Sequence, residues 1–293
     1  MKKILVPTDF SLPAENAASY AMHLAKEMQV NVKLCNAIKV PIEAPMADQV
    51  SWPLVDYSTL ERETTENLKI LAKKIEWPFD KEAAPDSFHP GVEYSIGVGP
   101  VGDVVNNFAD NRNISMVVMG MSGAGGITQF LLGSNSRAMV ENAEIPILLV
   151  PKDIRFKGIH KIAFATDLNE KDIELIHELA GFARTFNAEI LLVHVDNKAP
   201  EDKSKDQKKI DSFLNEITNK VNYHKIYYEY IWNIDVDNGL EWLAEQGQVS
   251  MLAMVHRKHN MFYRIFKGSH TQRVKNRIKL PLLVLPEFFR KRI

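Results

Sequence analysis

The chain has 293 residues, of which 45% are hydrophobic and 25% are charged, and its formal net charge is −1. This length suits two domains of the commonest size, and this composition is that of a globular protein rather than a disordered or membrane chain. The small net charge provides no overall field to attract nucleic acid or an anionic membrane, so an electrostatic partner must bind a local patch. No apolar run reaches the roughly 20 residues that span a bilayer, no secretion signal is evident, and a single cysteine excludes an internal disulfide. We therefore expect a cytoplasmic protein without a membrane partner.

The chain consists of two copies of one sequence unit. Residues 3–9 read Lys-Ile-Leu-Val-Pro-Thr-Asp, and residues 161–167 read Lys-Ile-Ala-Phe-Ala-Thr-Asp. Each segment is followed, at the same distance, by a helical pattern and a second apolar run, and each copy closes on an apolar run flanked by prolines. Such symmetry indicates a duplication. The predicted domains are residues 1–152, called copy one, and residues 158–293, called copy two.

Within each copy, β-branched runs alternate with segments of helical period, the pattern of βαβ units around a parallel sheet. The predicted fold class is therefore α/β, with a five-stranded parallel sheet in each copy and helices on both faces. Strands are predicted at 3–7, 32–37, 92–96, 114–119 and 145–150 in copy one, and at 161–166, 190–195, 226–231, 249–255 and 281–285 in copy two. Helices of copy one are predicted near 13–29, 59–76, 101–111 and 134–143.

The two closing strands offer a way to join the copies. Strands 145–150 and 281–285 could pair edge to edge, as the closing strands of two sister subunits would. The duplication would then replace a homodimer by a pseudo-dimer within one chain. A further homodimer of the whole chain stays open.

A glycine-rich loop follows the predicted strand 114–119. Residues 120–126 include four glycines, and Gly133, Ser134 and Asn135 open the next predicted helix. Glycine lets a backbone approach an anion closely, and the free N–H groups at a helix start supply positive potential. This order of strand, loop and helix predicts a phosphate site. Ser134 or Ser136 as a plain N-cap is the alternative, although a cap does not account for four glycines.

The spacing of this loop resembles the ATP-binding signature of the universal stress protein family. Two residues separate Gly120 from Gly123, and nine separate Gly123 from Gly133. The Thr-Asp pair after the first strand and the closing strand are similar to that family as well, over both copies. The resemblance implies two tandem domains of the adenine-nucleotide-binding type, of which the first binds ATP or a related adenine nucleotide, with or without Mg²⁺.

The resemblance also implies roles for ten residues of copy one. Pro7, Thr8 and Asp9 would lie beside the base and the ribose, and the backbone of Ala37 would lie at the adenine edge. The residues that would hold the ribose and phosphates are Gly120, Met121, Gly123, Gly133, Ser134 and Asn135. A carboxylate at a strand end can accept ribose hydroxyls while backbone amides bind phosphate. The alternative for Asp9 is an N-cap of the helix that begins near Leu12.

A second glycine pattern imitates a dinucleotide fingerprint. Residues 97–102 read Gly-Val-Gly-Pro-Val-Gly, between a predicted strand and a predicted helix. However, the pattern follows the third strand rather than the first, and the next strand ends without an acidic residue for a ribose. We predict instead a glycine turn with Pro100 as the first helical residue.

Copy two has lost the loop glycines and gained a basic segment. Counting back from Gly268, Val255 and Lys258 stand where copy one has Gly120 and Gly123, so we do not expect copy two to bind ATP in the family's way. Residues 256–279 contain eight Lys and Arg and no acid, which predicts a cationic face. Either this face is solvated, or it binds an anion near Gly268 with Lys258 as a point charge. Nucleic acid is not the expected partner, because few aromatic residues interrupt the charges.

The expected function is regulatory nucleotide binding in a stress response. No catalytic residue or metal ligand is predicted, because no Ser/His/Asp set, carboxylate pair or Walker lysine can be assembled near the loop. Two alternatives stay open. One is a slow ATPase or nucleotidyl-transfer enzyme that uses Asp9 with a divalent ion, and the other is a scaffold with an empty pocket.

Overall fold

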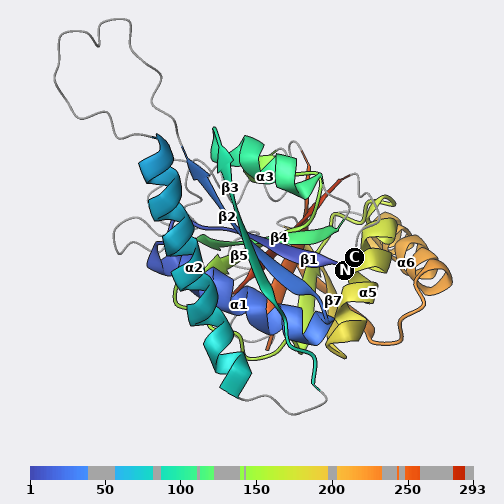
Figure 1. Cartoon of the computed structure of the whole chain (residues 1–293). Coiled ribbons are helices and arrows are strands. Elements are labelled where there is room, and N and C mark those ends of the chain that lie inside the picture. Colours follow the sequence, from blue (N-terminus) through green and yellow to red (C-terminus); the bar gives the residue numbers. More distant parts are fainter. Residues whose placement is uncertain are drawn as a thin grey trace, which may run out of the picture.

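The structure is a computed structural model of the chain, and it describes residues 1–38, 57–81, 87–110, 113–121, 139–141, 143–196, 203–232, 243, 248–257 and 280–287. These residues form a ten-stranded sheet in the order β3-β2-β1-β4-β5-β10-β9-β6-β7-β8 (Figure 1). The predicted α/β fold with five strands in each copy is confirmed. No helix in the described ranges is both long and apolar enough to cross a bilayer.

Copy one and copy two repeat the same order of strands. Copy one comprises β1 (Lys3–Pro7), α1 (Leu12–Met28), β2 (Asn31–Ile38), α2 (Tyr57–Lys81), β3 (Val92–Val98), α3 (Val101–Ala109), β4 (Ile114–Met121) and β5 (Ile147–Pro151). Copy two comprises β6 (Lys161–Ala165), α5 (Asp172–Thr185), β7 (Glu189–Asp196), α6 (Lys203–Lys220), β8 (Ile226–Trp232), β9 (Met251–His256) and β10 (Leu282–Pro286). The helix predicted at 59–76 extends to Lys81. Of the helix predicted at 134–143, residues 139–141 are helical, and most of the rest lies outside the described residues.

The strand order of each copy creates a crevice at a defined place. In copy one, β1 pairs in parallel with β2 on one side and with β4 on the other, so that Pro7 lies opposite Cys35 and Leu5 opposite Val117. The chain builds β2 and β3 on one side of β1 and then crosses over to build β4 and β5 on the other. Ligands of open α/β sheets bind at such a reversal, outside the carboxyl ends of the two strands. The reversal lies between β1 and β4 in copy one and between β6 and β9 in copy two.

The two copies join through their closing strands, as predicted. β5 and β10 pair antiparallel, with Leu148 opposite Leu283, whereas the other paired strands of the described sheet are parallel. An antiparallel pair is what a two-fold relation between equivalent strands produces. The pairing covers one edge of each half-sheet and leaves β3 and β8 as the edges of the whole sheet.

Helices cover both faces of the sheet, which confirms that prediction. One face carries a core to which α1, α2, α5 and α6 contribute, with α1 beside α2 and α5 beside α6 (Figure 1). The other face carries a second core with α3 and residues 139–140. The side of α1 that packs on the sheet is rich in small residues, namely Ala14, Ala17, Ala18, Ala21 and Ala25. Small side chains let the helix approach the strands closely, and β1, buried on both faces, reads as a continuous apolar run.

The connection between the copies is fixed to α1. The side-chain amide of Asn16 donates hydrogen bonds to the carbonyl oxygens of Pro151 (3.1 Å) and Ile154 (2.9 Å). Phe156 packs edge-on against Tyr20, with 5.1 Å between the ring centroids. The segment after β5 is therefore held on the same helix whose first turn borders the crevice of copy one.

Candidate functional site

The predicted site residues that the structure describes gather at one edge of the sheet. Thr8 and Asp9 follow β1, and Gly120 and Met121 end the neighbouring strand β4. On the other side of β1, Ala37 in β2 lies two residues beyond the partner of Pro7. These residues lie at the chain reversal, where open α/β sheets bind their ligands. The remaining predicted residues, Gly123, Gly133, Ser134 and Asn135, lie outside the described residues.

A network of hydrogen bonds shapes the turn that follows β1. The Thr8 N–H donates to the carbonyl of Cys35 (2.9 Å), and the Thr8 carbonyl accepts from the amide of Asn36 (2.8 Å). The Thr8 hydroxyl oxygen accepts from the N–H of Phe10 (3.0 Å), which has a φ of +62°. A non-glycine residue keeps this conformation only when its surroundings impose it. These hydrogen bonds therefore fix the conformation of the turn, in which Asp9 is exposed to solvent.

Asp9 supports the start of α1 without being its cap. The cap is Ser11, whose hydroxyl oxygen accepts from the N–H of Ala14 (3.4 Å). Asp9 Oδ1 in turn accepts from the N–H (3.1 Å) and the hydroxyl (2.5 Å) of Ser11. The alternative in which Asp9 is the N-cap is therefore wrong. Both bonds use Oδ1, so within the described part of the chain Asp9 Oδ2 can accept a hydroxyl from a ligand.

Gly120 is required for helix packing at the crevice. A Cβ atom on Gly120 would lie 2.3 Å from the carbonyl oxygen of Pro13 and 3.0 Å from the N–H nitrogen of Ala14. The missing side chain thus lets the first turn of α1 pack against the end of β4, a reason that the phosphate interpretation did not include. The side chain of Met121 is buried in the second core, so only its backbone can face the crevice.

Two glycines of residues 97–102, which resemble a dinucleotide fingerprint, are required by packing and by backbone conformation. A Cβ on Gly97 would lie 2.4 Å from a methyl carbon of Val104, and Gly99 has a φ of +122°, which side chains rarely allow. Pro100 occupies the N-cap position, and α3 begins at Val101, so the prediction of Pro100 as the first helical residue is wrong by one position.

Copy two repeats the threonine-centred turn of copy one. The hydroxyl oxygen of Thr166, the equivalent of Thr8, accepts from the N–H of Leu168 (2.9 Å), whose φ is +59°. His194 takes the place of Asn36, with Nδ1 2.9 Å from the Thr166 carbonyl oxygen. Sequence reasoning missed Asn36 and His194. The signal that could have found them is a polar residue at the same position of the second strand in both copies.

An ion pair distinguishes copy two. Arg257, the residue after β9, donates from Nη2 to Oδ1 of Asp172 (2.6 Å), and Asp172 Oδ2 accepts from the Thr166 hydroxyl (2.7 Å). Only 9% of Arg257 and 1% of Asp172 is exposed. Burial raises the pKa of Asp172, while the hydrogen bond from Thr166 and the charge of Arg257 oppose this rise. Arg257 therefore does not belong to a solvated cationic face, which corrects that part of the prediction. Residues 258–279 lie outside the described residues.

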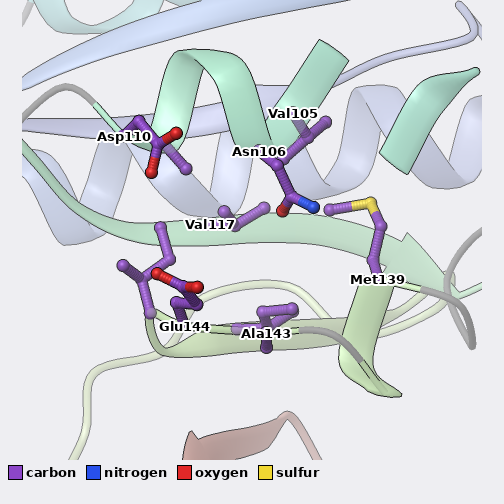
Figure 2. A pocket seen from close by; sticks show the side chains of 10 residues that line it. Val105, Asn106, Asp110, Val117, Met139, Ala143 and Glu144 are labelled. Carbon is purple, nitrogen blue, oxygen red and sulfur yellow. The ribbon is translucent and has the colours of Figure 1, made fainter. Parts of the chain in front are cut away.

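A separate cavity of about 110 Å³ lies at the opposite edge of copy one, between α3 and the amino end of β5 (Figure 2). Figure 2 shows the carboxylates of Asp110 and Glu144 together with the apolar side chains of Val117 and Met139. None of the predicted site residues lines this cavity. Among the residues with described positions, no three side chains of the metal-ligating types form a group.

The known proteins that are similar to this chain are universal stress proteins. The model of the universal stress protein family matches residues 1–151 and again residues 158–286. A universal stress protein of Methanocaldococcus jannaschii is 32% identical over 152 residues, which cover 52% of this chain and 82% of that protein. A universal stress protein of Bacillus subtilis is 26% identical over 151 residues, which cover 50% of this chain and 97% of that protein. Among solved structures, a universal stress protein from Archaeoglobus fulgidus shares the fold over 97% of this chain and 98% of its own, with a TM-score of 0.69 and 15% identity.

Proposed function

Because the chain belongs to the universal stress protein family, we propose that copy one binds ATP or a related adenine nucleotide in the crevice between β1 and β4. Binding regulates a partner, or the assembly of the protein itself, in a stress response. The observation that carries the proposal is the position of Asp9. Its exposed carboxylate lies at the chain reversal, on a turn fixed by Thr8, at the same edge as Gly120.

The residues around the crevice suit the parts of a nucleotide. The carboxylate of Asp9 accepts the ribose hydroxyls, and the backbone of Ala37 meets the adenine edge. The phosphates bind the backbone N–H groups of the glycine loop that begins at Gly120 and of the segment Gly133-Ser134-Asn135, with or without Mg²⁺. Binding of this kind needs no catalytic base, so the proposal concerns binding and not hydrolysis.

The direct test is the identity of any nucleotide that the protein carries. The protein purified under native conditions is heated, and the released small molecules are identified by mass spectrometry. We expect an adenine nucleotide, and calorimetry with added ATP after its removal should show one site per chain. A protein that releases no nucleotide and shows no heat of ATP binding would be the scaffold with an empty pocket.

Asp9→Ala is expected to weaken ATP binding at least tenfold, because a hydrogen bond to a charged group contributes about 1.5–3 kcal/mol. The matched control is Asp167→Ala, the same substitution at the equivalent position of copy two, which should leave the affinity unchanged. Both carboxylates are exposed, so neither substitution should unfold the protein. Calorimetric titration of the two variants measures the effect, and equal losses of affinity would contradict the assignment of the site to copy one.

A further inference from the structure

Charged side chains of the chain itself meet at the chain reversal of copy two. β6 and β9 are neighbours at the second chain reversal, with Ala165 opposite Met254. Asp167 follows β6 as Asp9 follows β1, and Arg257 follows β9 at the position that Ser122 holds after β4. Arg257 and Asp167 therefore border the same crevice from its two sides.

Arg257 bridges this crevice through three carboxylates. Besides its 2.6 Å bond to Asp172, its Nη1 lies 3.6 Å from Oδ1 of Asp167, and its Nε lies 3.6 Å from Oε1 of Glu287, just beyond β10. Asp167, the counterpart of the proposed ribose ligand Asp9, is thus paired with a guanidinium group of its own chain. The guanidinium is hydrogen-bonded to Asp172 of α5, and it lies near the carboxylates at the ends of β6 and β10.

Among the residues that the structure describes, the space beside Arg257 is small. The cavity that borders Arg257 has a volume of about 30 Å³, and its lining residues are Ala165, Thr166, Asp167, Asp172, Met254, Val255 and Arg257. Sites that enclose small organic ligands measure roughly 300–1,000 Å³. A nucleotide at this place would have to displace Arg257, and its phosphates would then face Asp167 and Asp172 without the guanidinium that pairs with them.

Copy one keeps the counterpart of Asp167, which is Asp9, but differs at the other three positions. Ala14 stands in place of Asp172, Ser122 in place of Arg257, and Lys152 in place of Glu287. The difference between the copies is therefore a coordinated set of replacements rather than only the loss of loop glycines.

We propose that Arg257 is a built-in occupant of the nucleotide crevice of copy two, held there by Asp172, Asp167 and Glu287. The arginine closes this half of the protein and limits the chain to one adenine-nucleotide site. This inference rests on the proposed function of copy one. By this inference, Arg257 blocks nucleotide binding in copy two, so that only copy one binds the nucleotide.

The first arm of the test uses the wild-type protein. It is irradiated with 8-azido-ATP, with and without excess ATP, and the labelled peptides are mapped by mass spectrometry. Specific labelling, which is the labelling that excess ATP prevents and is called competable label below, is expected in copy one alone. Such label on copy-two peptides around Asp167 or Arg257 would overturn the closed crevice, and label in neither half would refute the proposed function together with this inference.

The second arm reopens the crevice. The variant Asp172→Ala/Val255→Gly/Arg257→Ser/Lys258→Gly gives copy two the residues of copy one at these four positions. We expect the number of ATP molecules bound per chain to rise from one to two, with new competable label in copy two. If the wild type binds one ATP and the folded variant still binds one, the inference fails while the proposed function stands.

A smaller variant covers the case in which four substitutions prevent folding. Asp172→Ala/Arg257→Ser removes the buried pair as a unit, and circular dichroism checks its fold. It should gain competable label in copy two at least threefold above the wild-type background. Label at the wild-type level would overturn the role of Arg257.

Discussion

Arg257→Ser is expected to lower the free energy of unfolding by about 3 to 5 kcal/mol, because breaking a buried ion pair leaves one charge without its partner. The stranded group would be Asp172, of which only 1% is exposed and which lies in the first turn of α5. Urea unfolding followed by circular dichroism measures the loss.

The double variant Asp172→Ala/Arg257→Ser is the control, because it removes both charges and installs the residues of copy one. It should lose clearly less stability than Arg257→Ser alone. Equal losses in the two variants would mean that the cost does not come from the stranded carboxylate.

The stability deficit of Arg257→Ser should also depend on pH. Without the arginine, burial raises the pKa of Asp172 further above its value in the unfolded chain, which is about 3.9. The cost of the ionised group is therefore fully present above the folded pKa and disappears as the pH falls below the unfolded pKa. The deficit relative to the wild type should shrink between pH 7 and pH 4. A deficit that is constant or grows over this range would contradict a buried, unpaired Asp172.

Gly120→Val is expected to lower the free energy of unfolding by about 3 kcal/mol, because overpacking forces the surrounding backbone to shift. The substitution introduces the residue that copy two has at this position, Val255. The nearest obstacle is rigid, since the new Cβ would lie 2.3 Å from the carbonyl oxygen of Pro13 at the start of α1. The first turn of α1 would have to move away from β4, so ATP affinity should fall as well. Urea unfolding and calorimetry measure the two effects.

Gly181→Val is the matched control for this prediction. Gly181 lies within α5, and a Cβ atom there would meet no atom within 4 Å outside its chain neighbours and the backbone of its own helix. Because valine has a slightly better helix propensity than glycine, the change in stability should stay within about 0.5 kcal/mol. Similar losses at both positions would show that the packing of α1 on Gly120 is not the cause.

The sequence by itself determined the duplication, the α/β class and the positions of the strands. These features rest on local patterns, since apolar runs of strand length and helical periods repeat within each copy at matching distances. The pairing of the closing strands was also predictable, because two equivalent strands in a duplicated unit have a symmetric partner in each other. The position of Thr8 and Asp9 at the end of the first strand placed them at the ligand edge of a parallel sheet.

Only the tertiary structure decided how the two crevices differ. Arg257 and Asp172 are 85 residues apart in the chain, and their contact depends on the register of β6 with β9 and on the placement of α5. In the sequence, Arg257 belongs to an acid-free basic run, so local charge indicates a solvated cationic face. The acids that surround it come from three other elements, and nothing in the local pattern encodes their approach. The packing reason for Gly120 is non-local in the same way, because it depends on how closely the first turn of α1 lies against β4. Composition and periodicity are local properties of the chain, whereas the burial of a charge depends on which distant groups the fold brings within hydrogen-bonding distance.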